Sequence, residues 1–282
     1  MRRDRGQTFS PHSNCYNLPV SQNSPVRLLS VPPGREFPHE WYELASIDNF
    51  WMQWRARAFF ALLRSLGLPL SEPLSGLEIG CGNGTLRAQI ERATAWTVDG
   101  ADIDLKALEM NPPLRGETLL YDVSDRRQDM RERYDFLVLF DVIEHIADVP
   151  SFLNGCLFHL KPGGWLFVNV PALESLRSDY DDAVGHLRRY DRRALRRALE
   201  GSGQTTVAVR YWGATIVPLL AVRKLVLKMT PREKIVERGF AVPGRLADIF
   251  LKILMRVETR LPMAPPVGTS LMAAVRKVGP SR

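Results

Sequence analysis

The chain of 282 residues is long enough to bury a full hydrophobic core, and its 45% hydrophobic and 24% charged residues exclude a chain that is disordered throughout. Its formal net charge of +7 conceals an asymmetry, because residues 1 to 173 carry −4 and residues 174 to 282 carry +11. The basic half could meet nucleic acid, anionic lipid or an acidic substrate, or it could be a solvated surface.

The cysteine spacing and the hydropathy pattern limit the cellular compartments that the chain fits. The three cysteines are widely spaced and form no C-x-x-C pair, so we expect neither a disulfide framework nor a metal site. No apolar run reaches the roughly 18 residues of a membrane-spanning helix, and polar residues follow the basic start where a secretory signal would be apolar. These features favour a reducing, cytoplasmic setting.

The first third of the chain divides into a tail and a helix. Residues 1 to 35 contain five prolines among Ser, Asn and Gln, which predicts a flexible N-terminal tail without chemistry of its own. From residue 41 to residue 66, apolar side chains recur at helical spacing, and Pro69 and Pro73 separate this predicted helix from the next element. We therefore expect one folded domain over residues 36 to 282.

A glycine-rich turn follows the predicted strand that ends at residue 79. Glu78 precedes three glycines at alternate positions, Gly80, Gly82 and Gly84, and a helix is predicted over residues 85 to 93. Glycine adopts backbone angles that other residues resist and lets a ligand contact the main chain, where the free N–H groups of a helix start lie. A tight structural turn without a ligand is the alternative. The spacing differs from the G-x-G-x-x-G of dinucleotide sites, which disfavours an NAD-dependent oxidoreductase.

Four further strands alternate with helices after this turn. They are predicted over residues 96 to 102, 118 to 121, 134 to 141 and 165 to 170. The first ends at Asp102, about 20 residues after the glycines, where a carboxylate can accept hydrogen bonds from both hydroxyls of a ribose. The pattern predicts an α/β fold with a doubly wound, mostly parallel sheet and a ligand site over the carboxyl ends of the strands.

The ordered set of motifs resembles the class I S-adenosylmethionine-dependent methyltransferases of the small-molecule type 11/12 group. Glu78 and the glycines match E/D-x-G-x-G-x-G, residues 144 to 148 match E-H-I-x-D, and residues 160 to 164 read L-K-P-G-G before a strand. The resemblance covers residues 40 to 212 and the last strand. It implies a Rossmann-like fold and S-adenosylmethionine as cofactor, with S-adenosylhomocysteine as product. The residues that it places at the cofactor are Glu78, Gly80, Cys81, Gly82, Gly84, Asp102, Ile103, Asp122, Val123, Phe140 and Asp141.

Three further residues, from two parts of the chain, are predicted to contact the methyl acceptor. Trp51 and Arg55 resemble an aromatic-plus-arginine segment that folds over the cofactor in many small-molecule methyltransferases, although an ordinary amphipathic helix with an exposed Arg55 gives the same pattern. His145 is a candidate for substrate contact or base chemistry, and the alternative is that it caps or packs the following helix.

A dense polar loop spans residues 178 to 190. It resembles the loop H-D-x-x-x-G-H-x-R-R-Y of a methyltransferase subgroup, with Tyr180 where that subgroup has histidine. His186 is the candidate base for a hydroxyl acceptor, with Asp181 to orient it, and Tyr190 is the third catalytic candidate. Arg189 is assigned to the substrate. Alternatively, Asp181, His186 and Arg189 lock the loop together as a staple.

Residues 213 to 262 interrupt two strands predicted to close the sheet as an antiparallel pair, over residues 204 to 211 and 269 to 276. An apolar stripe recurs at helical spacing over residues 246 to 257 and is flanked by basic residues. Such helices could form a lid, a dimer face or a contact with an anionic membrane at the inner face of the cell.

We therefore predict a methyltransferase that acts on a small-molecule acceptor or on one linked to lipid or glycan, with oxygen as the expected acceptor atom. A non-catalytic methyltransferase-like docking protein is the second hypothesis, and the oxidoreductase is the third. A nucleic-acid substrate is disfavoured because no N/D-P-P-Y/F motif follows the strand that ends at Phe140.

Overall fold

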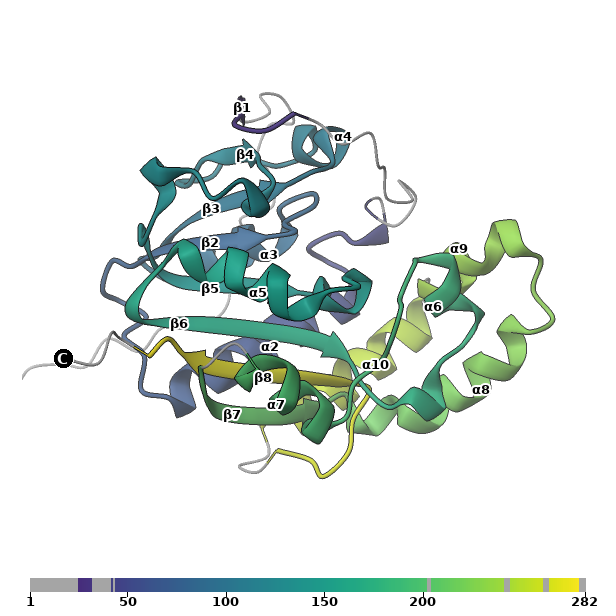
Figure 1. Cartoon of the computed structure of the whole chain (residues 1–282). Helices are drawn as coiled ribbons and strands as arrows, with labels where there is room; N and C mark the ends of the chain where they lie inside the picture. Colours follow the sequence, from purple (N-terminus) through teal and green to yellow (C-terminus); the bar gives the residue numbers. More distant parts are fainter. Residues whose placement is uncertain are drawn as a thin grey trace, which may run out of the picture.

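The computed structural model describes residues 25–31, 42, 44–201, 204–240, 244–260 and 264–278. Its centre is an eight-stranded sheet in the order β1-β4-β3-β2-β5-β6-β8-β7 (Figure 1). The strands are β1 (Val26–Leu28), β2 (Ser75–Ile79), β3 (Thr97–Asp102), β4 (Thr118–Leu120), β5 (Tyr134–Phe140), β6 (Leu160–Pro171), β7 (Thr205–Trp212) and β8 (Ser270–Arg276). β8 runs antiparallel to both β6 and β7, while the other neighbours are parallel. The predicted doubly wound sheet with a terminal antiparallel pair is confirmed.

Helices cover both faces of the sheet. They are α2 (Phe50–Ser65), α3 (Thr85–Ala93), α4 (Leu105–Glu109), α5 (Val149–Phe158), α6 (Asp179–Ala183), α7 (Arg192–Glu200), α8 (Val217–Leu227), α9 (Ile235–Phe240) and α10 (Arg245–Glu258). Short 3-10 turns are η1 (Val123–Asp125), η2 (Gln128–Met130), η3 (Ile143–His145), η4 (Glu174–Leu176), η5 (Ala214–Ile216) and η6 (Arg232–Lys234). None of the helices in the described part of the chain is both long and apolar enough to span a membrane.

Strand β5 shows how the two faces are filled. Its Leu137 and Leu139 belong to the core under α5 and α7, whereas Phe136, Val138 and Phe140 belong to the core under α2, α3 and α10. Because successive side chains of a strand point to opposite faces, a continuous apolar run is what a strand covered on both sides requires.

The chain order of the strands reverses between β2 and β5. β3 and β4 lie on one side of β2, and β5 and β6 lie on the other side. The connections after β2 and β5 therefore diverge and leave a crevice at the carboxyl ends of these strands. This crevice is the place where the predicted site residues meet.

The first described helix is shorter than the sequence pattern predicts. α2 begins at Phe50, because the Asn49 side chain accepts a hydrogen bond from Trp51 N at 2.8 Å and caps the helix. Residue 41 and most of the predicted tail, residues 1–24 and 32–35, lie outside the described residues.

The predicted tail is wrong at β1. Val26–Leu28 adds a parallel strand to the edge of β4, and Arg27 forms an ion pair with Glu117 at 3.3 Å. Three residues are too few to show a period, and the strand is stabilised by main-chain hydrogen bonds to an edge that lies about 90 residues further along the chain.

The segment between β7 and β8, predicted as a helical insertion, contains α8, α9 and α10. Together with α6, these helices gather beyond one end of the sheet (Figure 1). α10 packs Leu251 and Met255 into the core, and its Glu258 carboxylate accepts hydrogen bonds from Gly213 N at 2.6 Å and Thr215 N at 3.0 Å.

Candidate functional site

The glycine turn after β2 has the backbone that its sequence requires. Gly80, Gly82 and Gly84 have φ of 74°, 51° and 74°, in the left-handed region that glycine favours. A Cβ on Gly82 would lie 2.7 Å from Tyr42 Cε1, and one on Gly80 would lie 2.6 Å from Val142 Cγ2. A side chain at either position would therefore clash with its neighbour, and the turn can pass close to the cavity that Gly80 and Gly82 line.

Asp102 ties this turn to the end of β3. Its carboxylate accepts hydrogen bonds from Gly82 N at 2.8 Å, from Ile103 N at 2.7 Å and from Asp104 N at 3.0 Å. Burial raises the pKa of the Asp102 carboxyl, and the three N–H donors oppose that shift. Its contact with a ribose stays a prediction.

Glu78 lies beneath the turn and is 3% exposed. Burial raises the pKa of this carboxyl to about 7, although Arg55 and Arg87 favour the charged form. Its Oε2 has no hydrogen-bond partner among the described residues. A buried carboxylate oxygen of this kind can accept a donor or neutralise a positive charge on a ligand.

These residues line a first cavity of about 390 Å³. Of the residues predicted at the cofactor, those that line it are Glu78, Gly80, Cys81, Gly82, Asp102, Ile103, Phe140 and Asp141. Tyr42 and Met52 also line it, although no local sequence signal points to either.

Three predicted cofactor residues are not brought into this cavity. Gly84 caps the start of α3, and Val123 packs in the core. Asp122 instead caps η1, where its carboxylate accepts a hydrogen bond from Ser124 N at 2.8 Å. Acids are common in turns for this reason.

Arg55 and Asp141 form a partly buried ion pair across the crevice. Arg55 Nη1 donates to Asp141 Oδ2 at 2.6 Å, and Asn169 Nδ2 donates to Asp141 Oδ1 at 2.7 Å. Arg55 is 5% exposed, which contradicts an ordinary helix with an exposed arginine. Asp141 has a φ of 58°, an uncommon angle for a residue with a side chain, at the point where β5 enters the crevice. Trp51 lies beside Trp212, with ring centroids 4.6 Å apart.

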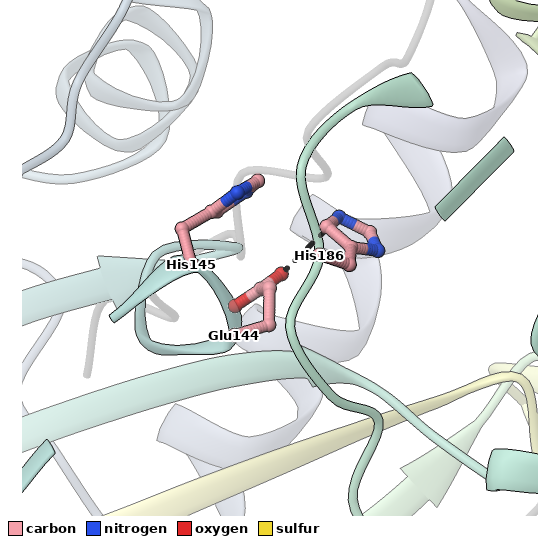
Figure 2. A group of neighbouring side chains, drawn as sticks. All are labelled: Glu144, His145 and His186. Atoms are coloured by element: carbon pink, nitrogen blue, oxygen red, sulfur yellow. Dashed lines mark ion pairs between the residues drawn. The ribbon is translucent and has the colours of Figure 1, made fainter. Parts of the chain in front are cut away.

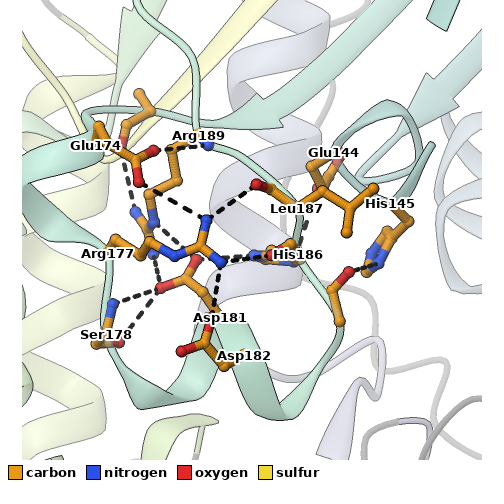
Figure 3. A network of polar contacts seen from close by, with 12 residues as sticks. Glu144, His145, Glu174, Arg177, Ser178, Asp181, Asp182, His186, Leu187 and Arg189 are labelled. Carbon is orange, nitrogen blue, oxygen red and sulfur yellow. Dashed lines mark hydrogen bonds and ion pairs between the residues drawn. The ribbon is translucent and has the colours of Figure 1, made fainter. Parts of the chain in front are cut away.

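Asp181 organises the loop after β6 (Figure 3). Its carboxylate accepts hydrogen bonds from His186 Nδ1 at 2.8 Å, from Arg189 Nε at 2.7 Å and from Ser178 N at 2.9 Å. Burial alone would raise the pKa of Asp181, but the hydrogen bonds from His186 and Arg189 hold it well below its usual range. The same carboxylate therefore holds His186 and Arg189 together in the loop, as the predicted staple requires, while the catalytic role of His186 stays a prediction.

Tyr190 is not placed for catalysis. It is 4% exposed, packs in the core, and donates its hydroxyl to Ile143 O at 3.3 Å. It lines neither this cavity nor the one beside it, so the prediction of a catalytic Tyr190 is wrong. A tyrosine ring buries easily when its hydroxyl finds a backbone acceptor.

Glu144, His145 and His186 converge at the edge of the first cavity (Figure 2). His145 Nδ1 lies 3.1 Å from Gly185 O, and burial together with His186 lowers the pKa of His145 to about 4. Glu144 is fully buried, its Oε1 lies 3.9 Å from His186 Nε2, and burial raises its pKa.

One ligand atom from each of these three side chains lies within 4.8 Å of the others, so the group could hold a metal ion. No metal site is predicted from the sequence. Local spacing does not reveal this grouping, because Glu144 and His186 come from η3 and from the loop after β6, and only the fold joins them.

A second cavity of about 320 Å³ lies beside the first and shares Asp141, Tyr180 and His186 with it. Trp51 and Arg189, both predicted at the substrate, line this second cavity, while Arg55 and His145 line the first. Its other walls come from η5, α8, α9, α10 and the start of β8. The two cavities thus meet at His186.

A protein-family model identifies the class of protein to which the chain belongs. Residues 50–209, more than half of the chain, match a family model described as a methyltransferase domain. The chain belongs to this methyltransferase family. Membership confirms the predicted enzyme class, with S-adenosylmethionine as its cofactor. The glycine turn that lines the first cavity and the Glu78 oxygen, which has no hydrogen-bond partner within the described part of the chain, fit that cofactor, which carries a positive charge and no phosphate.

Curated relatives of the methyltransferase include ubiquinone biosynthesis O-methyltransferases. That of Chelativorans sp. is 32% identical over 101 residues, which are 34% of this chain and 40% of the relative. That of Paracidovorax citrulli is 28% identical over 145 residues, which are 48% of this chain and 58% of the relative. The match thus spans less than two thirds of the length of either relative.

Solved structures share the fold at low identity. A methyltransferase of Galdieria sulphuraria named for sarcosine and dimethylglycine has a TM-score of 0.53 at 15% identity, covering 79% of this chain and 86% of that one. A SAM-dependent methyltransferase of Thermotoga maritima has a TM-score of 0.50 at 15% identity, covering 85% of this chain and 94% of that one.

Proposed function

We propose that this methyltransferase transfers a methyl group from S-adenosylmethionine to an oxygen atom of a small-molecule acceptor. The observation that carries the proposal is the junction of the two cavities at Asp141, Tyr180 and His186. One cavity has the glycine turn and the other has apolar walls, so donor and acceptor can meet at that junction. The names of the O-methyltransferase relatives support oxygen as the acceptor atom.

The glycine turn, Glu78 and Asp102 would hold S-adenosylmethionine, whose sulfonium supplies an electrophilic methyl group when it is bound. Asp102 keeps the turn in place by accepting a hydrogen bond from Gly82 N. Glu78 brings a negative charge beneath the turn, which favours a cationic ligand.

His186 would act as the base that takes the proton of the acceptor hydroxyl. Its Nδ1 donates to Asp181, which fixes the tautomer and leaves Nε2 as the basic atom. The ionised Asp181 also stabilises the imidazolium that forms. General-base assistance of this kind contributes about 10²- to 10⁴-fold in rate.

Isothermal titration with S-adenosylmethionine tests the cofactor site. We expect Gly82→Arg to abolish binding, because a side chain there would fill the turn, and Asp102→Ala to weaken binding at least tenfold. Asp182→Ala, an exposed change in the neighbouring loop, serves as control. Absence of heat with the unmodified protein, or unchanged binding by Gly82→Arg, refutes the proposal.

Release of S-adenosylhomocysteine across a panel of hydroxylated acceptors tests the reaction itself. His186→Gln should lower kcat about 10²-fold or more while S-adenosylmethionine binds as before. Retained turnover in His186→Gln would exclude it as the base. Cofactor binding without product from any acceptor would instead favour the non-catalytic docking protein.

We further propose that α8 and α10 bring the enzyme to an anionic membrane surface at the inner face of the cell, where a lipid-linked acceptor would be found. Both helices expose large apolar side chains, namely Leu219, Val222, Leu225 and Val226 on α8 and Leu246, Ile249, Phe250, Ile253 and Val257 on α10. Basic residues flank them, as on helices that bind anionic lipid.

A further inference from the structure

The second cavity combines apolar walls with a cation that forms no ion pair with any described residue. Its apolar walls include Trp51 of α2, Ile216 of η5, Leu220 of α8 and Leu251 of α10. Arg223 of α8 also lines the cavity, and this side chain has no place in the reaction proposed above.

Arg223 is held rigidly by groups that carry no negative charge. Its guanidinium lies over the Tyr180 ring, 4.8 Å from the centroid, and its Nη1 donates to Gly239 O. The Nε is buried without a hydrogen-bond partner, and no carboxylate in the described ranges forms an ion pair with Arg223. A desolvated cation without a counter-ion destabilises a protein unless a ligand supplies the charge.

The other charged groups of this cavity are paired or point outward. Asp141 is neutralised by Arg55, and Arg189 by Asp181. Arg238 of α9 is exposed at the cavity rim, and it too lacks an ion-pair partner within the described part of the chain. The cavity therefore presents positive charge that no neighbouring carboxylate balances, next to a wall that favours a hydrocarbon or aromatic body.

We propose that the acceptor is an amphipathic molecule whose anionic group, a carboxylate or a phosphate, binds Arg223 while its apolar body fills the second cavity. The inference names the substrate class of the methyl transfer proposed above and rests on it. A planar guanidinium with free N–H donors suits either anion, because both offer two oxygens at matching spacing. The anion would fix the molecule at α8, away from Asp141, and leave its hydroxyl end at His186.

The charge preference can be measured without catalysis by titrating the full chain with four probes of equal length: octanoate, octyl phosphate, octanol and octylammonium. We expect at least one anionic probe to bind more than tenfold tighter than octanol, and octylammonium to bind weakest. The tighter of the two anions identifies the group. Equal binding of octanol and both anions would overturn the proposal.

Two variants locate the preference. Arg223→Leu should remove the advantage of the anionic probe over octanol, and Arg223→Lys should retain part of it because the charge remains. Arg232→Leu removes an exposed cation of the same insertion that lines neither cavity, so it should leave binding unchanged. An undiminished preference in Arg223→Leu would refute the assignment. If Arg223→Leu fails to fold, two other results test the proposal: the anion preference of Arg223→Lys and the weak binding of octylammonium to the unmodified protein.

S-adenosylmethionine binding, measured on the same samples, separates this inference from the proposed function. If the unmodified protein does not bind S-adenosylmethionine but keeps the anion preference, the proposed methyl transfer is refuted and the anion site stands. Cofactor binding without an anion preference would instead refute the anion site and leave the proposed methyl transfer standing.

Discussion

At the scale of single residues, Asp181 serves two purposes with one carboxylate. It receives two hydrogen bonds from Arg189, at 2.7 and 3.0 Å, and one from His186, and it has no exposed surface. A base must keep one tautomer and one orientation to be useful, and a loop can provide that only when it is held rigidly. The hydrogen bonds that fix the loop are therefore also those that would orient His186 in the proposed role of base.

Replacing Asp181 with asparagine should destabilise the protein strongly. The change leaves Arg189 buried without a counter-ion, which costs about 3 to 5 kcal/mol of the free energy of unfolding. Asp182→Asn is the matched control, because this side chain is 68% exposed and its ion pair with Arg177 contributes about 0 to 1 kcal/mol. Urea unfolding measures both, and equal losses would show that the Asp181–Arg189 pair does not stabilise the loop.

Glu78 should make the stability of the cofactor-free protein depend on pH. Its pKa is about 7 when folded and about 4.5 when unfolded, so its contribution is fully present below pH 4.5 and is lost as pH rises through 7. Glu78→Gln stays neutral, and its free energy of unfolding relative to the unmodified protein should rise by about 2 to 3 kcal/mol from pH 5 to pH 8.

Thermal unfolding across that pH range, with exposed Glu109→Gln as control, measures the change. A difference between Glu78→Gln and the unmodified protein that stays constant with pH would contradict a raised Glu78 pKa.

The residues that could be predicted from sequence share a local signal. The glycine turn and Asp102 occupy fixed offsets after buried strands, so their spacing alone places them. Arg223 has no such signal, because its significance comes from the loss of water and counter-ions around it in the fold. Tyr190 shows the converse, since a motif position predicted chemistry where the fold uses the side chain as core.

At the scale of elements, the central strands β5 and β6 follow from the sequence because each contains an apolar run bounded by turn residues. Alternate residues of β5 pack against helices on opposite faces of the sheet, as the apolar sequence of this strand predicts. β1 and the start of α2 depend instead on partners, the edge of β4 and the Asn49 cap. The docking of the insertion likewise depends on a tertiary contact, in which the Glu258 carboxylate accepts hydrogen bonds from Gly213 N and Thr215 N.

Glu258→Ala should loosen the junction between α10 and η5. The change leaves the N–H groups of Gly213 and Thr215 without their acceptor, in a place where Glu258 is 6% exposed. We expect a loss of about 2 to 4 kcal/mol in the free energy of unfolding. Chemical denaturation with exposed Glu237→Ala of α9 as control tests this, and a loss below that of the control would show that α10 is held by apolar packing alone.

At the scale of the whole molecule, exposed apolar side chains gather on one part of the fold, the helices between β7 and β8. α8, α9 and α10 belong to the positive half of the chain and stand beyond one end of the sheet (Figure 1), and residues of all three line the second cavity. The side of α10 opposite its buried Leu251 and Met255 exposes Phe250 at 59% and Ile253 at 50%. An apolar face of this kind calls for a partner, either a membrane or a second copy of the chain.

Flotation with vesicles of phosphatidylglycerol and phosphatidylcholine distinguishes these partners. The protein should float at low salt and progressively less as salt rises, because each basic residue near the surface contributes about 1 kcal/mol. The double change Phe250→Glu and Ile253→Glu should abolish flotation, whereas Val278→Glu, an equally exposed apolar position outside the insertion, should not. If the protein instead fails to float and sediments as a dimer that the double change dissociates, the face joins two copies and the membrane proposal is wrong.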